Sequence, residues 1–577
     1  MNDIIIKQRI TPKEVTLSSE LHPLLKRLYT ARGVTSDEEL NNSTNAMLNY
    51  KLLAGIDNAT NLLYDAVVKQ KTIWIVGDFD TDGATSTALL YTALTKFGIK
   101  NIHYLIPDRF EDGYGLSVSV VQRVKAQGAE LIITVDNGVS AIEAVDYAKQ
   151  NGIDVIITDH HLAPDVLPNA DAIINPNLKE CGFPSKNLAG VGVTFYFMLA
   201  FRAKLREIDW FQKNTLVEYN IANLLDLVAL GTIADLVNLD HNNRILVQQG
   251  LHRIRAGYCC PGIKALIRIT NRNMANITAQ DLSYYLAPRI NAAGRMENMS
   301  LGVELLLAQD EPSALEVAQL LDNLNSERKR VEQNMHQEAM VYINEIENNT
   351  KTIPNTFVLH HPDFHQGVIG VLSSKIKERF YRPVFSFAVS EKDYLKGSGR
   401  SIDGIHLRDI LENINMRDPS LIVCFGGHAM AAGLTIKQQN LEKFTHYFEE
   451  AVSKIMLDSS LTQAIITDGE LESEYLNLET AKAIRAAGPW GSGFPEPYFN
   501  GEFIVHQQKI VAIKHLRLVL EPVSGGQLIN AIAFNIDPSI WPDNSVDRIK
   551  AVYQIEVAEF RGNQSLNMLI RHIQAIG

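Results

Sequence analysis

The feature that most constrains the fold is an alternation of short apolar runs with helix-length segments between residues 70 and 175. The apolar runs are rich in Ile, Val and Thr and read TIWIVG, NIHYLIP, ELIITVD, DVIITD and DAIINP. Segments such as ATSTALLYTALTKFG and SAIEAVDYAKQNG separate them. Because each helix carries the chain back across the sheet, successive strands of this kind run parallel. The pattern predicts an α/β fold with a doubly wound parallel sheet.

The 577-residue chain is long enough for further domains, at roughly 150 residues per domain. A helical stretch follows from Val191 to Leu239. Residues 305–348 are rich in Ala, Glu, Leu, Gln, Arg and Lys, which predicts a long helix joining two domains, with a coiled-coil stub as the alternative. Strand and helix patterns return between residues 356 and 455 and predict a second α/β domain. Beyond Thr467, short apolar runs separated by Gly, Asn and Pro predict an all-β barrel or sandwich.

These patterns divide the chain into five parts. We predict an N-terminal segment at 1–50, the first α/β domain at 51–304, the linking helix at 305–350, the second α/β domain at 351–456 and the β-barrel at 457–577.

Composition excludes several classes of protein. The first residues, MNDIIIKQRITPKEV, lack the features of a secretory signal, and no stretch approaches the roughly 20 apolar residues of a membrane helix. The four cysteines form no CxxC pair and are too scattered for a disulfide framework. The net charge of −12 argues against nonspecific coating of nucleic acid, so a nucleic-acid partner would need a locally basic groove. We expect a cytoplasmic protein without contact to a membrane.

Three aspartates follow the first strand of the predicted sheet. The string GDFDTDGATS places Asp78, Asp80 and Asp82 at the carboxyl end of the strand TIWIV, where doubly wound sheets bind ligands. An EF-hand is a poor alternative, because its twelfth position holds Leu89 and the loop follows a strand. Asp82 is a candidate cap of the next helix. Three carboxylates within five residues repel one another unless a cation offsets their charge.

Two further strands end in metal-ligand residue types. ELIITVDNGVS ends in Asp136 and Asn137, and DVIITDHHLAPD ends in Asp159, His160 and His161. Each motif alone is an ordinary loop feature or helix cap. Together, three parallel strands carry such residues to one edge of one sheet, which predicts a metal centre there.

The apolar helix NLLDLVALGTIADLVNL carries two more acids, Asp226 and Asp235. A buried carboxylate needs a cation or a basic partner, and we favour Asp226 as the ligand, with Asp235 as a supporting or helix-pairing group. Oxygen-rich ligation with imidazole and no thiolate favours Mn²⁺ or Mg²⁺. Two such ions would activate a water for hydrolysis at phosphorus. The sequence lacks a Walker A loop and a GxGxxG motif, so nucleotide-driven and hydride-transfer chemistry have no phosphate cradle.

The strings GDFDTDG, TVDNG, TDHH and DLVALGTIAD, in that order, resemble the four motifs of the DHH phosphoesterase superfamily. IPDRFEDGYGL, LAGVGVTF, APRINAAGRM, FHQGVIGVLSSKI, GSGRSIDGIHL, FGGHAMAAGLT and GPWGSGFPEPYF are similar to the bacterial RecJ exonuclease family. The resemblance implies a 5′-to-3′ exonuclease specific for single-stranded DNA that releases mononucleotides with two Mn²⁺ or Mg²⁺ ions. It also implies a DHH domain, a DHHA1 domain with a cleft between the two, and an OB-like DNA-binding barrel that guides the strand.

The resemblance assigns site residues position by position. The implied catalytic metal ligands are Asp80, Asp82, Asp136, His160 and Asp226. Asp78 is a further expected ligand, His161 a further catalytic residue, and Asp159 a residue that orients its neighbours.

The resemblance also implies a set of substrate-binding residues. These are Arg109, Ser398 and Arg400 for the terminal 5′ phosphate, Arg289, Asn291 and Arg295 for other DNA phosphates, and His428 in the GGH turn. Guanidinium groups bind phosphate bidentately, and the Gly-flanked GSGRS loop allows close backbone approach. A salt bridge beside Asp108 is the alternative for Arg109, and tying domains together is the alternative for the PRINAAGRM residues.

Basic residues alternate with apolar ones in the predicted barrel, at Lys509, Lys514, His515, Arg517 and Arg561. One face of the barrel could therefore carry a nucleic-acid strand, although solvated strands look the same. The resemblance implies roles in repair and recombination. We expect a monomer that acts on single-stranded DNA, and the sequence leaves open whether a single-strand-binding protein, a helicase or a mismatch-repair factor recruits it.

Two rival functions remain open. One is a phosphodiesterase for oligoribonucleotides or cyclic dinucleotides, or a pyrophosphatase, for which the β-barrel is unnecessary. The other is a noncatalytic DNA-binding scaffold, which would have lost several metal ligands.

Overall fold

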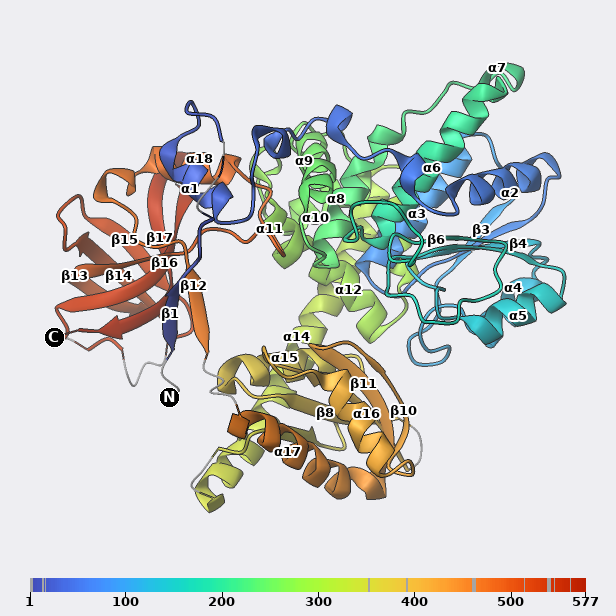
Figure 1. Ribbon diagram of the computed structural model, residues 1–577. Helices are drawn as coiled ribbons and strands as arrows, with labels where there is room; N and C mark the ends of the chain where they lie inside the picture. Colours follow the sequence, from blue (N-terminus) through green and yellow to red (C-terminus); the bar gives the residue numbers. More distant parts are fainter. Residues whose placement is uncertain are drawn as a thin grey trace. The chain divides into compact units, whose positions relative to one another are not determined.

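The computed structural model describes residues 4–12, 15, 17–350, 353–390, 393–458, 463–512, 514–536, 541–543, 545–560 and 562–576 (Figure 1). The chain forms two compact units. The first contains Met1–Ile5, Asp108–Glu111 and Pro288–Gln463, and the second contains Ile6–Pro107, Asp112–Ala287 and Ala464–Gly577.

The second unit contains a five-stranded sheet, all of whose strand pairs are parallel. Its strands are β2 (Ile73–Val76), β3 (Ile102–Leu105), β4 (Leu131–Val135), β5 (Asp154–Thr158) and β6 (Ala172–Ile174), in the order β3-β2-β4-β5-β6. Every residue of β2 and β4 is buried, as expected for central strands covered on both faces.

Helices surround this sheet (Figure 1). They include α2 (Ile56–Val68), α3 (Thr81–Lys96), α4 (Val118–Ala126), α5 (Ile142–Gln150), α6 (Gly190–Glu207) and α8 (Leu225–Ala234). The sequence of α8, LDLVALGTIA, is apolar around its whole circumference, and α8 packs against α3 and α6. The consequence is that α8 runs through the interior beside the carboxylate-rich strand ends.

The strand order places a topological switch between β2 and β4. These strands are neighbours, but the chain leaves β2 for β3 on one side, and β4 is followed by β5 on the other. Ligands of doubly wound sheets bind at the carboxyl ends of the strands beside such a switch. The loops after β2 and β4 carry the predicted aspartates, so the topology puts them at the expected position.

The same unit contains a closed barrel in the order β13-β14-β15-β17-β16. Its strands are β13 (Phe499–Val511), β14 (His515–Pro522), β15 (Ile529–Ala533), β16 (Arg548–Phe560) and β17 (Asn563–Ala575). Neighbouring strands are antiparallel except β15 and β17, which pair in parallel. Helix α18 (Leu478–Ala486) packs on β16 and β17.

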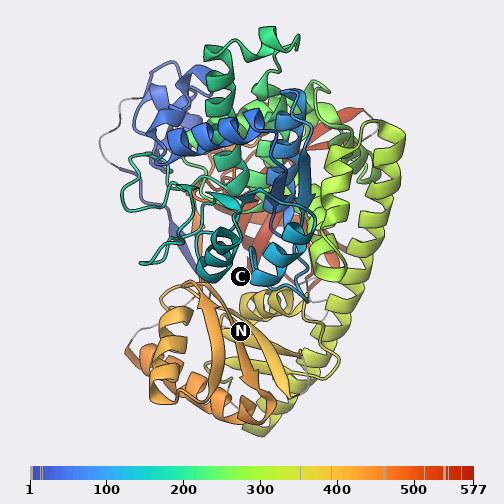
Figure 2. The same cartoon turned by 90° about the vertical axis from the view of Figure 1, so that its right-hand side faces the viewer.

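The other unit contains a mixed sheet in the order β10-β11-β9-β8-β7. Its strands are β7 (Phe357–His360), β8 (Val384–Val389), β9 (Tyr394–Arg400), β10 (Ile422–Gly427) and β11 (Ala431–Lys437), with α15 (Ile369–Phe380), α16 (Leu407–Arg417) and α17 (Leu441–Asp458). The yellow-green helix α14 (Glu311–Thr350) precedes them in the chain and is continuous in Figure 2. Strong helix formers dominate its sequence.

The observed architecture confirms the predicted fold class: a doubly wound parallel sheet, a long helix, a second α/β domain and a C-terminal β-barrel. The proposed domain boundaries stay predictions. The long helix begins at Glu311, after a separate short helix α13 (Ser300–Leu307). Within the described residues, no helix is both long and apolar enough to cross a membrane.

Candidate metal centre

Three parallel strands deliver acidic and imidazole side chains to one edge of the sheet. Asp78 and Asp80 follow β2, Asp136 follows β4, and His160 and His161 follow β5. Asp136 has a left-handed backbone with φ of 64°, a conformation that non-glycine residues adopt at a cost and that is common at functional sites. Ligand atoms lie within 4.8 Å of one another in three overlapping groups, which are Asp78/Asp80/Asp136, Asp136/His160/His161 and Asp82/His160/Asp235.

His160 lies at the centre of these groups. Its Nε2 atom is 3.0 Å from Oδ1 of Asp136 and 3.5 Å from Oδ2 of Asp235. All three atoms are buried, and none has a hydrogen-bond partner among the described residues. Buried polar atoms are rarely left unpaired, so atoms aimed at a common point indicate a missing binding partner. The donor set, carboxylate oxygens with imidazole and no thiolate, fits Mn²⁺ or Mg²⁺.

The electrostatics of the cluster support a cation. Burial and the charge of Asp80 raise the pKa of Asp82 to about 7. Burial and neighbouring carboxylates, Asp82 first, also raise the pKa of Asp136 and of Asp235 well above the usual range. Burial lowers the pKa of His160 to about 4, which keeps the imidazole neutral. Carboxylates that cannot all ionise together, beside a neutral imidazole, are the arrangement that a divalent ion stabilises.

Asp80 and Asp82 hold different positions from those that the sequence suggested. Asp80 is the N-cap of α3 and accepts a hydrogen bond from the backbone of Gly83 at 3.0 Å. The expectation that Asp82 caps this helix is therefore wrong. Asp82 lies in the first turn of α3 and accepts backbone hydrogen bonds at the N-terminus of α6, from Gly190 at 2.6 Å and from Val191 at 3.0 Å.

Asp226 lies outside the three groups, and its role as a metal ligand stays a prediction. Asp226 lies in the first turn of α8 and accepts a hydrogen bond from the backbone of Cys260 at 2.8 Å. Asp235 is the C-cap of the same helix, and nine residues of helix span about 13 Å. Only the C-terminal end of α8, at Asp235, lies beside His160 at the carboxyl ends of the parallel strands. Sequence reasoning named Asp235 but could not tell which end of an evenly apolar helix faces the sheet.

His161 makes hydrogen bonds of its own, to Asp159 and Tyr114. Asp159 is buried and accepts hydrogen bonds at Oδ1 from the backbone and Nδ1 of His161, and at Oδ2 from the backbone of Val139. The other ring nitrogen, Nε2, lies 3.1 Å from the hydroxyl of Tyr114. Burial would lower the pKa of His161, but the hydrogen bond and charge of Asp159 outweigh it and raise this pKa to about 9. Asp159 thus orients His161, as expected. Sequence reasoning did not identify Tyr114.

The other unit brings three arginines and a serine to one cavity of about 410 Å³. Its lining includes Arg109, Arg295, Ser398 and Arg400, together with Gly370 in the first turn of α15. Arg400 Nη1 donates to the Ser398 hydroxyl at 3.2 Å. A Cβ atom at Gly370 would lie 3.0 Å from that hydroxyl, so glycine leaves room beside it. Guanidinium groups beside the start of a helix form an electropositive, anion-binding environment.

The remaining predicted substrate residues lie elsewhere. Arg289 pairs with Asp322 at 2.8 Å, which favours the structural alternative for this residue. Asn291 is half-buried on α12 (Ala287–Met296). His428 is exposed in the turn after β10, where its backbone donates to Ala431, and it does not line the cavity.

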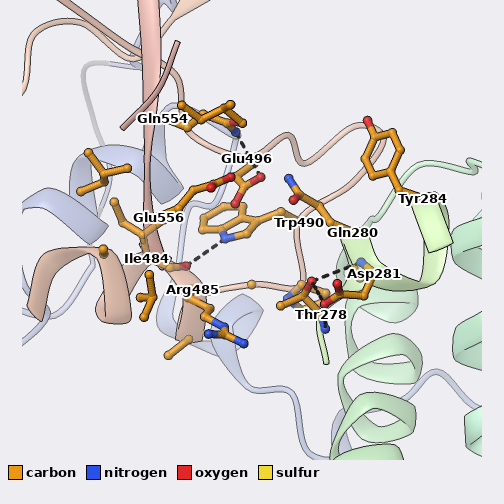
Figure 3. Close-up of a pocket in the computed structure, with 18 of the residues that line it drawn as sticks. Thr278, Gln280, Asp281, Tyr284, Ile484, Arg485, Trp490, Glu496, Gln554 and Glu556 are labelled. Carbon is orange, nitrogen blue, oxygen red and sulfur yellow. Dashed lines mark hydrogen bonds between the residues drawn. The ribbon is translucent and has the colours of Figure 1, made fainter. Parts of the chain in front are cut away.

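A second cavity, of about 640 Å³, lies within the metal-bearing unit between helical segments and the barrel (Figure 3). Tyr284 lines it and is 72% exposed, on the π-helical segment η6 (Leu282–Leu286). Glu496 lies on the opposite side and accepts a hydrogen bond from Gln554 at 3.1 Å. The cavity also has basic residues, namely Arg255, Arg272, Arg485 and Arg571.

Two basic residues of the barrel face each other across strands. Lys509 on β13 and Arg517 on β14 are register partners, and both are exposed. Directly opposed like charges destabilise a sheet unless an anion lies between them. Lys514 and His515 stand at the same hairpin, and Arg561 lies outside the described residues.

Three family models match successive parts of the chain. The DHH family, N-terminal domain matches residues 72–232, the DHHA1 domain matches 333–454 and the RecJ OB domain matches 467–572. Among curated relatives, the chain is 51% identical to the single-stranded-DNA-specific exonuclease RecJ of Salmonella typhimurium, covering 98% of both chains. It is 50% identical to the protein of that name from Escherichia coli K12, covering 99% of both.

Solved structures share the fold. A structure of Thermus thermophilus RecJ in complex with Mn²⁺ matches with a TM-score of 0.80 and 24% identity, covering 100% of this chain and 80% of that one. A structure of the same protein with Mg²⁺ matches with a TM-score of 0.71 and 24% identity, covering 97% and 75%.

Proposed function

This chain belongs to the RecJ family, and we propose that it is a metal-dependent exonuclease that degrades single-stranded DNA from the 5′ end and releases 5′-mononucleotides. Relatives about half identical over nearly their whole length carry the name single-stranded-DNA-specific exonuclease. The observation that carries the catalytic part is the buried cluster around His160, in which His160 Nε2, Asp136 Oδ1 and Asp235 Oδ2 have no hydrogen-bond partner among the described residues.

The proposed metal ligands are Asp78, Asp80, Asp82, Asp136, His160 and Asp235, and the metal is Mn²⁺ or Mg²⁺. Asp235 takes the place that we first gave to Asp226. Two such ions lower the pKa of a bound water and stabilise negative charge at phosphorus. The chain supplies the carboxylate cage, the neutral imidazole of His160, and the fixed imidazole of His161 on the rim.

The arginine-lined cavity of the other unit is the proposed site for the terminal 5′ phosphate. Arg109, Arg295 and Arg400 supply guanidinium groups, and Ser398 supplies a hydroxyl. Such a site would select a 5′ end, which supports the proposed polarity. The roles proposed earlier for Arg289, Asn291 and His428 have weaker support, because the cavity does not include them.

The cavity between helices and barrel suits the strand beyond the reacting end. Tyr284 offers a face for stacking on a base, and four arginines line the same space. This supports the proposed guidance of the strand by the OB domain. An enzyme for short oligonucleotides or pyrophosphate would not need this cavity.

The chain would act in the cytoplasm during repair and recombination, where bacterial DNA is unwound. A helicase and a single-strand-binding protein are the proposed partners, because duplex DNA must be unwound and kept single-stranded before it is a substrate. We propose a monomer, because one chain supplies all the metal-ligand candidates.

The test is Mn²⁺-dependent digestion of a long single-stranded DNA labelled at one end or the other, beside its duplex and an RNA of the same sequence. Release of labelled mononucleotide from the 5′ end of the single-stranded DNA alone is the expected result. Release from the 3′ end would contradict the polarity. Activity confined to dinucleotides would favour the small-substrate phosphodiesterases, and DNA binding without hydrolysis would favour a scaffold.

A further inference from the structure

Tyr114 contacts the His161 ring beside the metal centre, and the hydrolytic role proposed above does not use it. Its hydroxyl lies 3.1 Å from Nε2 of His161, and the two rings meet edge to face with centroids 5.8 Å apart. Phe79 contacts the Tyr114 ring at a centroid distance of 5.7 Å. The tyrosine therefore has a defined position between an aromatic neighbour and the imidazole.

The loop that carries Tyr114 is fixed to the strand ends of the metal centre. The backbone of Leu116 donates to Oδ1 of Asn137 at 3.1 Å, and Asn137 Nδ2 donates to the carbonyls of Val76 and Val135 at 3.0 and 2.9 Å. Gly115 has φ of 64°, and a Cβ atom there would lie 3.1 Å from Asn137. These contacts tie the loop to the ends of β2 and β4.

Both ring nitrogens of His161 are engaged in this arrangement. An ionised Asp159 can only accept, so Nδ1 of His161 donates to Asp159 Oδ1 at 2.7 Å. Nε2 is the nitrogen that faces Tyr114. His160 differs, because its Nε2 atom faces carboxylates without a hydrogen-bond partner among the described residues. The Nε2 atoms of the two adjacent histidines therefore have different neighbours, carboxylates for His160 and the Tyr114 hydroxyl for His161.

We propose that Tyr114 is a positioning residue for the hydrolytic reaction: its hydroxyl fixes the His161 ring, already held by Asp159, at the angle from which the ring meets the substrate phosphate. This inference rests on the proposed function. It assigns Tyr114 an effect on turnover that passes through His161, with no contribution to metal binding.

A double-mutant cycle tests the proposal. The variants are Tyr114→Phe, which removes only the hydroxyl, His161→Ala, and the two together. We expect Tyr114→Phe to lower kcat about tenfold, the effect of one hydrogen bond, with KM for single-stranded DNA unchanged. The double variant should be no slower than His161→Ala alone, because the tyrosine acts through the histidine. The rise in Tm that Mn²⁺ produces should be the same in Tyr114→Phe and wild type.

Tyr91→Phe on α3 is the matched control and should behave as wild type. Multiplicative losses in the double variant, a higher KM with kcat unchanged, or wild-type turnover in Tyr114→Phe would each overturn the proposal. The cycle is repeated with bis(p-nitrophenyl) phosphate. If the wild type cleaves this ester but not DNA, the proposed function fails while the role of Tyr114 is still measured.

Discussion

At the scale of single residues, the two acids of α8 have different contacts. Asp235 lies with His160 and Asp82, whereas Asp226 accepts from the backbone of Cys260. We expect Asp235→Asn to lose at least about 100-fold in activity and to lose the Mn²⁺-induced rise in Tm. Asp226→Asn removes the same charge but keeps an acceptor, so it should stay within about threefold of wild-type activity. The reverse pattern would restore the original assignment.

Glu496 gives a residue-scale prediction for pH. Burial, then the charge of Glu556, raises its pKa from 4.5 to about 7. The folded state therefore binds a proton more tightly than the unfolded state. The stabilising effect of the protonated Glu496 carboxyl is fully present below about pH 4.5 and is lost as pH rises through 7. Glu496→Gln cannot ionise, so it should be more stable than wild type at pH 8, by about 3 kcal/mol.

Thermal melts at pH 5 and pH 8 check this expectation. The variant and the wild type should nearly coincide at pH 5 and separate at pH 8. Glu474→Gln, at an exposed position, serves as control and should change neither melt. Equal Tm values of Glu496→Gln and wild type at pH 8 would show that ionisation of the Glu496 carboxyl does not destabilise the folded protein.

At the scale of elements, the metal centre depends on close packing of three helices through one glycine. A Cβ atom at Gly231 of α8 would lie 2.3 Å from Thr85 on α3, 2.7 Å from Val191 on α6 and 2.8 Å from Oδ1 of Asp82. Gly231→Ala should therefore destabilise the fold by about 1–3 kcal/mol and displace Asp82. We expect a lower Tm and a weaker Mn²⁺-induced shift. Gly182→Ala, which meets no atom within 4 Å, should leave both unchanged.

The segment η6 gives a second element-scale prediction. Tyr284 faces the cavity beside the barrel, and base stacking contributes about 1–3 kcal/mol per base. Tyr284→Ala should raise KM for a long single strand about tenfold and leave kcat and the cleavage of a trinucleotide unchanged. Tyr258→Ala, at another exposed tyrosine outside that cavity, is the control. An equal effect on both substrates would remove the cavity from the strand's path.

The sequence predicted the helices and strands better than it predicted which of their residues meet. Unbroken apolar runs such as IWIV predict buried parallel strands, and the acids at their ends therefore meet. The sequence could not predict that Asp235, and not Asp226, lies beside His160, because α8 is apolar on all sides and carries no directional pattern. Tyr114 was missed because its contact with His161 joins loops 47 residues apart. Hydrophobic periodicity describes a single helix or strand, so it cannot predict a contact between two loops.

At the scale of the whole molecule, the N-terminal segment and the C-terminal barrel region meet within one unit. Helix α1 (Pro23–Thr30) precedes Arg32, whose guanidinium donates to both oxygens of Asp468 at 2.9 and 3.0 Å. The partners are 436 residues apart, so no local pattern could predict them. Arg32 also donates to the carbonyl of Pro495 at 2.6 Å and lies 5.1 Å from the Trp490 ring centroid.

This buried pair leads to the last prediction. The side chains of Arg32 and Asp468 are 0% and 2% exposed, and Arg9 Nε lies 3.5 Å from the same carboxylate, so weakening the Arg32 contact leaves a buried charge less well compensated. Arg32→Lys keeps the charge but cannot reproduce the bidentate geometry, and we expect a loss of about 3 kcal/mol in the free energy of unfolding. Arg27→Lys is the matched control, because Arg27 makes an exposed pair with Glu472 that contributes at most about 1 kcal/mol.

Urea unfolding followed by tryptophan fluorescence measures both variants, since Trp490 lies beside Arg32. The midpoint should fall for Arg32→Lys and stay near wild type for Arg27→Lys. The Mn²⁺-induced rise in Tm should persist in both, because the metal ligands lie on other elements. If Arg32→Lys were as stable as Arg27→Lys, the contact between Arg32 and Asp468 would not contribute measurably to the free energy of unfolding.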